Sequence, residues 1–212
     1  MSHMVMNLVL AAVVASTIVP HPAEGQSLSD SPATTSLDAP IRATNPTLLA
    51  SLQRIWRGSP LWREAVTNVR KTGRYVLVAT PADVTLTDRN QSRQTFDPQA
   101  LGEAFPVLDN DARIQVVVVV VNLRLVQERH DARVSVRRDF DADLDRIVVH
   151  EVYGHAVPYL LAGNLSGRCA DPAGGESAIE ACAIRRENAV RSELGLGRRA
   201  DRGLYSLALA LR

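Results

Sequence analysis

The spacing of apolar and polar residues predicts an α+β fold for the chain after residue 47. Within residues 48–73, apolar positions recur at helical spacing and are interrupted at 58–60 (Gly-Ser-Pro), which predicts two short helices. Two β-branched runs, 75–79 and 84–87, predict strands paired through a tight turn. Six successive valines within 113–127 fit a strand buried on both faces, because β-branched side chains favour the pleated surface.

The second half of the chain predicts two longer helices behind this small sheet. After a polar loop at 128–138, a helical pattern runs from Phe140 to about Gly163, and it starts with acidic residues that favour a helix N-terminus (Asp141, Asp143 and Asp145). A second helix is predicted from about Glu176 to Leu194, ending at Gly195. Both helices are expected to pack against the sheet.

The N-terminal residues predict export. Residues 4–19 carry no charge and have the length of a signal-peptide apolar region, which is too short for a comfortable membrane span. We therefore expect a signal peptide or leader at 1–25, a flexible linker rich in Ser, Thr and Pro at 26–47, and a single folded domain at 48–212. We therefore expect the mature chain to be secreted or periplasmic and to contain no membrane span. The alternatives are a buried N-terminal strand or helix, or an uncleaved anchor.

Composition narrows the choice of partners. Hydrophobic residues make up 46% of the 212-residue chain, which is enough for a core, and a net charge of +1 gives no reason to expect nucleic acid. Two cysteines, Cys169 and Cys182, permit one disulfide, which would suit only an exported protein. The alternative is a pair of buried thiols. The sequence does not define an oligomeric state.

The segment HEVYGH carries the candidate chemistry. The zinc-binding HExxH helix places two histidines on one face with a glutamate beside them, but here His150 and His155 are five residues apart. On an ideal α-helix that spacing puts the two side chains roughly 140° apart. A single π-bulge would absorb the extra residue, and Gly154 would ease it. The alternative is two histidines that bind no metal.

A third zinc ligand is expected from the last helix. Glu176, Glu180 and Glu187 share a helical face with Arg191, whereas Glu193 does not. The alternative for such a stripe is a solvated charged face. Apolar residues border it, however (Ile179, Ala183 and Val190), which favours a buried position.

Two resemblances support a zinc metallopeptidase of the gluzincin type. HEVYGH resembles the HExxGH motif of dipeptidyl peptidase III, whose third ligand is a glutamate on a later helix. The segment EACAIRRENAVRSELGLGRR is similar to small bacterial metallopeptidases of the effector and Rhs-toxin type. That resemblance covers roughly residues 140–199 and implies Glu180 as the third ligand, with Glu176 in reserve. It also implies that Glu187, Asn188 and Arg191 surround the ligands, although the effector-type motif has four-residue histidine spacing.

These observations predict a zinc-dependent hydrolase that acts on a peptide or protein. His150, His155 and Glu180 would hold Zn²⁺, and Glu151 would act as general base on the metal-bound water. An oxyanion donor is also expected, with three tyrosines as candidates (Tyr153, Tyr159 and Tyr205). The alternatives are a non-catalytic domain in which zinc staples two helices, and a metal-free secreted interaction domain.

Overall fold

The computed structural model describes seven stretches of the chain: residues 33–34, 39–87, 93–94, 96–108, 113–132, 139–163 and 175–199. They form an α+β fold, as the sequence predicts. A five-stranded sheet has the order β1-β2-β3-β7-β6, and β4 and β5 form a separate antiparallel pair. The strands are β1 (Ala33–Thr34), β2 (Ile41–Ala43), β3 (Tyr75–Ala79), β4 (Leu86–Thr87), β5 (Arg93–Gln94), β6 (Gly102–Leu108) and β7 (Ile114–Val121).

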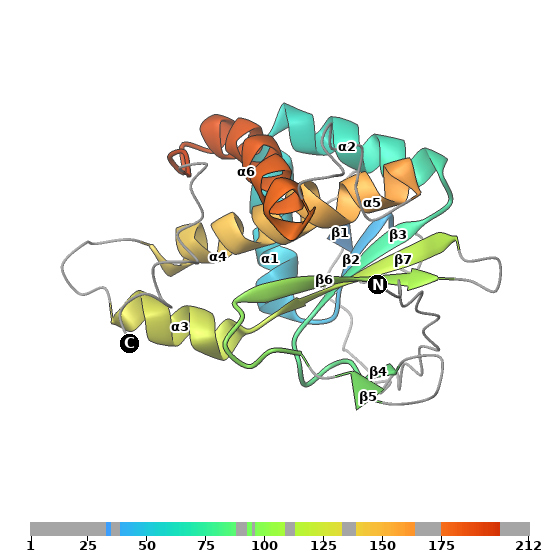
Figure 1. Cartoon of the computed structure of the whole chain (residues 1–212). Coiled ribbons are helices and arrows are strands. Elements are labelled where there is room, and N and C mark those ends of the chain that lie inside the picture. The colour runs from blue at the N-terminus through green and yellow to red at the C-terminus, as the bar shows by residue number, and fades with distance from the viewer. Residues whose placement is uncertain are drawn as a thin grey trace, which may run out of the picture.

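The helices gather on one side of the five-stranded sheet (Figure 1). Strands β1, β2, β3 and β7 are parallel to one another, and β6 runs antiparallel to β7 at the end of the sheet. The helices are α1 (Pro46–Gly58), α2 (Pro60–Lys71), α3 (Leu123–Asp131), α4 (Phe140–Val148), α5 (Val157–Ala162) and α6 (Gly175–Glu193), with a π-helical segment, η2 (Val149–Ala156), between α4 and α5.

The valine run forms the centre of the sheet, as predicted. Val117, Val119 and Val121 face the helices and belong to the larger apolar cluster. Val116, Val118 and Val120 point to the opposite face, where they join a smaller cluster with Leu77, Phe96 and Phe105. Since successive side chains of a strand point to opposite faces, an uninterrupted valine run is what a strand covered on both sides requires.

Local signals set the starts of helices α1, α2 and α4. Asn45 and Ser59 accept hydrogen bonds from the first turns of α1 and α2, and a proline follows each of them. Asp139 caps α4, and Asp145 further along that helix accepts hydrogen bonds from Ser51 Oγ (2.6 Å) and Arg54 Nη2 (2.8 Å) of α1. The motif helix is thereby joined to the first helix through a buried polar contact.

Three predictions about local structure are wrong. The prediction of a flexible linker at 26–47 is wrong for the last part of that range, since Ile41 and Ala43 of β2 are buried and pair with β3. Strand β4 pairs with β5 rather than with β3. The polar loop at 128–138 begins too early, because α3 continues to Asp131. Strand β6 and helix α3 were both missed.

Within the described residues, no helix is long and apolar enough to cross a membrane. Residues 1–25 lie outside those ranges, so the leader remains a prediction.

Candidate metal centre

The motif helix changes its hydrogen-bonding register where the extra residue lies. Residues 149–156 form a π-helix, and Val157 N bonds to Val152 O, five residues back. Because π-helical bonds run from i to i+5, residues five apart come to lie on successive turns of one face. The predicted correction of the histidine spacing is therefore confirmed, although it extends over a whole π-helical segment.

Proline helps to end the π segment. Pro158 has no N–H to offer the carbonyl of Gly154, and Arg186 Nη1 of α6 donates to that oxygen instead, at 3.3 Å. Gly163, with φ of 72°, then ends the helix in the left-handed conformation. The sequence around the motif thus explains both where the register changes and how the helix ends.

Three side chains converge on one point from η2 and α6. His150 Nε2 lies 3.3 Å from His155 Nε2, and Glu180 Oε2 lies 3.4 Å from each of these two nitrogens. A zinc ion bonded at about 2.0–2.1 Å to each donor in a tetrahedron separates the donors by about 3.3–3.4 Å. The donor set and its spacing therefore fit zinc, and these three residues could hold a metal ion.

Gly154 contributes through packing rather than through backbone freedom. A Cβ added there would lie 3.1 Å from the Cβ of Ala183 and 3.3 Å from its carbonyl oxygen. Gly154 is not among the glycines with positive φ in the described chain. The glycine lets η2 and α6 approach closely, and that approach brings Glu180 to the two histidines.

Glu187 orients the first histidine. Its side chain is fully buried, its Oε2 bonds to His150 Nδ1, and Oε1 accepts from Arg191 Nη1 at 2.7 Å. A carboxylate on Nδ1 holds the proton there and leaves Nε2 free for a metal. Burial alone would raise the pKa of Glu187, but the hydrogen bond and charge of His150, together with Arg191, lower it.

The carboxylates also retain a proton on His150 in the metal-free protein. Burial alone would lower the pKa of His150, but hydrogen bonds to Glu180 and Glu187 and the charge of Glu151 raise it to about 10. For Glu180, burial would raise the pKa, and contacts with both histidines outweigh it and lower the pKa. A metal cation at this cluster would therefore compete with a proton for the same histidine.

Glu151 is the group whose burial has no structural explanation. It is 7% exposed, and its carboxylate accepts no hydrogen bond from the described part of the chain. Its Oε1 lies 4.0 Å from His150 Nε2, beside the proposed metal position. Burial raises the pKa of Glu151, partly offset by the two histidines. A buried carboxylate that accepts no hydrogen bond is expensive to maintain, and such groups are characteristic of functional sites.

The three tyrosines have different surroundings. Tyr159 OH lies 3.2 Å from His155 Nδ1, so it supports the second histidine as Glu187 supports the first. Burial raises the pKa of Tyr159 to about 12. Tyr153 stacks on Trp62 away from the ligands, with ring centroids 6.3 Å apart. Tyr205 lies outside the described residues, and the oxyanion donor is still unassigned.

Of the other residues singled out on or near the ligand helix, Glu193 has defined partners, whereas the predictions for Glu176 and the cysteines stay untested. Glu193 accepts hydrogen bonds from Ser59 Oγ and Leu61 N at the start of α2, in agreement with its exclusion from the site. The side chain of Glu176, the reserve ligand, is not described, and Cys169 also lies outside the described residues. Cys182 is buried on α6, and its predicted bridge to Cys169 remains a prediction.

Asn188 does not touch the ligands and instead fixes the chain that follows α6. Its side chain accepts from Arg199 N (2.6 Å) and donates to Arg199 O (2.8 Å). The Arg199 guanidinium then reaches Glu180 Oε1, at 3.2 Å from Nη2. Sequence reasoning missed Arg199, because nothing in the local pattern separates it from Arg198.

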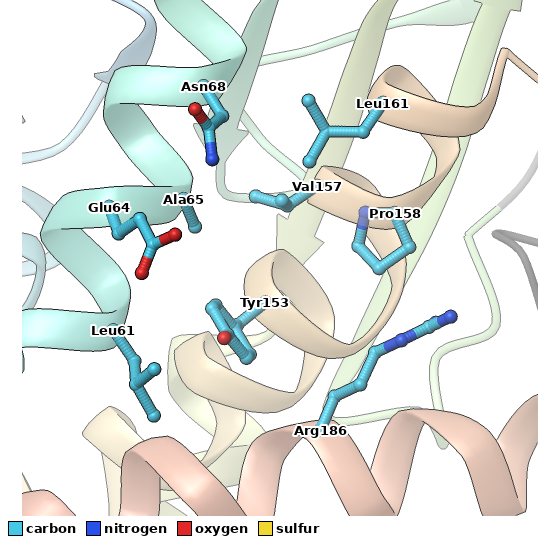
Figure 2. A pocket seen from close by; sticks show the side chains of 9 residues that line it. All are labelled: Leu61, Glu64, Ala65, Asn68, Tyr153, Val157, Pro158, Leu161 and Arg186. Carbon is cyan, nitrogen blue, oxygen red and sulfur yellow. The ribbon is translucent and has the colours of Figure 1, made fainter.

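A cavity of about 390 Å³ lies beside the motif helix but is separate from the metal centre. Helices α2, α5 and α6 and the end of η2 surround it, and Tyr153 and Arg186 point toward it (Figure 2). None of the three candidate ligands lines it, nor does Glu151. The cavity thus belongs to the packing behind the site.

Comparison with known protein families, with curated proteins and with solved structures found no match to this chain.

Proposed function

We propose that the protein is a zinc-dependent hydrolase, in which His150, His155 and Glu180 hold the metal and Glu151 is the general base. Zinc in that position would supply a Lewis acid for a carbonyl group and would lower the pKa of the attacking water. The observation that carries the proposal is the position of Glu151, which is buried and without a hydrogen-bond partner in the described chain, beside three donors at tetrahedral spacing.

The proposed roles use the geometry of each side chain. Glu151 would accept the proton of the attacking water and return it to the leaving group. Hydrogen bonds from the two Nδ1–H groups to Glu187 and Tyr159 would hold both imidazoles with Nε2 toward the metal. Burial raises the pKa of Glu151, which favours the acceptance of a proton by this carboxylate.

A peptide is the substrate that the sheet favours. Strand β6 ends the five-stranded sheet and pairs only with β7 among the described strands. Gly102 of β6 lies directly against Glu151, since a Cβ added there would be 2.7 Å from Glu151 Cγ. An extended peptide that added to this edge as a further strand would pass beside the proposed base.

The alternative of a zinc ion that only staples two helices explains less. A structural zinc is almost always bound by four protein ligands, whereas three are assembled in the described residues. A staple also requires no carboxylate like Glu151. In the metal-free alternative, Glu180 pairs with the two histidines, but the buried Glu151 beside them has no role.

The test compares hydrolysis of a fluorogenic peptide library and of unfolded casein by zinc-loaded wild-type protein, Glu151→Gln and Glu128→Gln. Glu128 is an exposed residue of α3 and serves as the matched control. We expect Glu151→Gln to retain zinc and to lose about 10²–10⁴-fold in rate, with Glu128→Gln unchanged. Equal hydrolysis by Glu151→Gln, or no hydrolysis by the zinc-loaded wild type, would contradict the proposal.

A further inference from the structure

We propose that Arg199 is a positioning residue that holds Glu180 in a one-oxygen binding mode toward the metal. This inference rests on the proposed function for the metal, and it assigns a role to a residue that the motifs do not include.

The two oxygens of Glu180 have different partners. Oε2 faces both histidines, at 3.4 Å from each Nε2. Oε1 points to the Arg199 guanidinium, with Nη2 at 3.2 Å. A carboxylate whose second oxygen is bonded to a cation presents one oxygen to a metal, so a fourth position stays available for water.

The approach of Arg199 depends on the chain reversal after α6. Gly195 has φ of 66°, a conformation that side chains rarely adopt, and Leu196 N bonds back to Arg191 O at 2.9 Å. The chain then runs back along the helix, and the two hydrogen bonds between Asn188 and the backbone of Arg199 fix its position.

Two further arginines hold the returning segment. Arg191 Nε donates to Gly197 O at 2.8 Å, and Arg146 of α4 donates to Leu196 O through Nε and Nη2, both at 3.1 Å. Backbone carbonyls of the returning segment thus accept hydrogen bonds from Arg191, Arg146 and Asn188. These bonds restrict the conformations that the segment can adopt. Arg199 is therefore presented to Glu180 by a rigid support, which is what a ligand-orienting group requires.

Whether zinc affinity rises or falls when Arg199 is replaced distinguishes a positioning role from a simple charge effect. Arg199 Nη2 is a fixed positive charge that repels a metal dication, so removing the charge alone would strengthen zinc binding. Removing a group that orients a ligand weakens metal binding, typically by 10- to 100-fold. We expect the second effect to dominate, because the side chain of Glu180 is 29% exposed and could otherwise rotate.

The experiment measures zinc affinity by chelator competition for wild type, Arg199→Met, Arg199→Lys and Arg198→Met. Arg198 is exposed and adjacent, so its variant removes the same charge without touching Glu180. We expect a 10- to 100-fold loss for Arg199→Met, partial recovery for Arg199→Lys, and less than a twofold change for Arg198→Met.

A spectroscopic readout tests whether Arg199 orients the ligands of the metal. The visible spectrum of the cobalt-loaded protein should change in Arg199→Met and not in Arg198→Met.

Unchanged or tighter zinc binding by Arg199→Met would overturn the inference, as would a cobalt spectrum that does not change in Arg199→Met. Wild-type protein that binds no zinc would instead overturn the proposed function, so the two failures are distinguishable.

Discussion

Glu187 provides the most informative perturbation, because it is fully buried and connects a candidate ligand to two arginines. It bonds to His150 Nδ1 and Arg191 Nη1 and lies 3.7 Å from Arg199 Nη1. In Glu187→Ala, Arg191 would remain 9% exposed without its counter-ion. Breaking a buried ion pair by removing one partner costs about 3–5 kcal/mol. We expect the free energy of unfolding of the metal-free protein to fall by that amount.

The zinc affinity should fall for a separate reason. Glu187→Gln retains the volume and an oxygen that can accept from His150 Nδ1–H, but it lacks the charge that fixes the proton there. Loss of such an outer partner weakens metal binding about 10- to 100-fold, which corresponds to about 1.4–2.7 kcal/mol. Urea unfolding of the metal-free protein and chelator competition measure the two effects independently.

Glu193→Gln is the matched control on the same helix. Glu193 bonds to Ser59 and to the backbone of Leu61 at the start of α2, not to the ligands. This variant should lower stability by about 0.5–2 kcal/mol through the helix cap and leave zinc affinity unchanged. The reasoning fails if Glu187→Gln binds zinc as tightly as Glu193→Gln does, or if Glu187→Ala unfolds at the wild-type urea concentration.

Three further changes test the packing and the proton balance of the site. Gly154→Ala should destabilise the protein by about 1–3 kcal/mol and weaken zinc binding, because the new Cβ would meet Ala183. Calorimetric melting measures the loss, which should be partly recovered in the Ala183→Gly background. An unchanged melting temperature in Gly154→Ala would count against this prediction. Gly102→Val should abolish hydrolysis while zinc content, measured by mass spectrometry, stays constant, since the new side chain displaces Glu151; retained hydrolysis would contradict this. In the metal-free protein, burial alone would lower the pKa of His150, but its carboxylate partners raise it from 6.5 to about 10. That stabilisation is complete below about pH 6.5 and is lost as the pH rises toward 10, so the metal-free melting temperature should fall across this range in wild type and not in His150→Gln.

The sequence predicts the cluster of His150, His155 and Glu180 better than its surroundings, and the reason is physical. Two histidines five residues apart can share an ion only if the helix changes register, so the spacing itself requires the π segment that is observed. The positions of Glu187 and Arg191 follow from helical periodicity on α6. Their individual partners, His150 for Glu187 and the carbonyl of Gly197 for Arg191, come from the structure alone.

The missed features depend on contacts between distant parts of the chain. Strand β2 is three residues long, and only its pairing with β1 and β3 makes it a strand. Strand β6 includes Gly102 and Pro106, which weaken any local strand signal and are tolerated because β6 lies at the end of the sheet. Arg199 reaches Glu180 only because the chain reverses at Gly195, and no periodic pattern encodes that reversal.

Metal content of the purified protein tests the central claim most directly. Protein prepared without chelators or a histidine tag, and reconstituted with zinc, would be measured by mass spectrometry beside His150→Ala, Glu180→Ala and Glu151→Gln. We predict about one zinc per chain in wild type and in Glu151→Gln, because Glu151 is not a ligand, and none in the other two variants. Wild-type protein that takes up no zinc, or a His150→Ala variant that keeps it, would contradict the account.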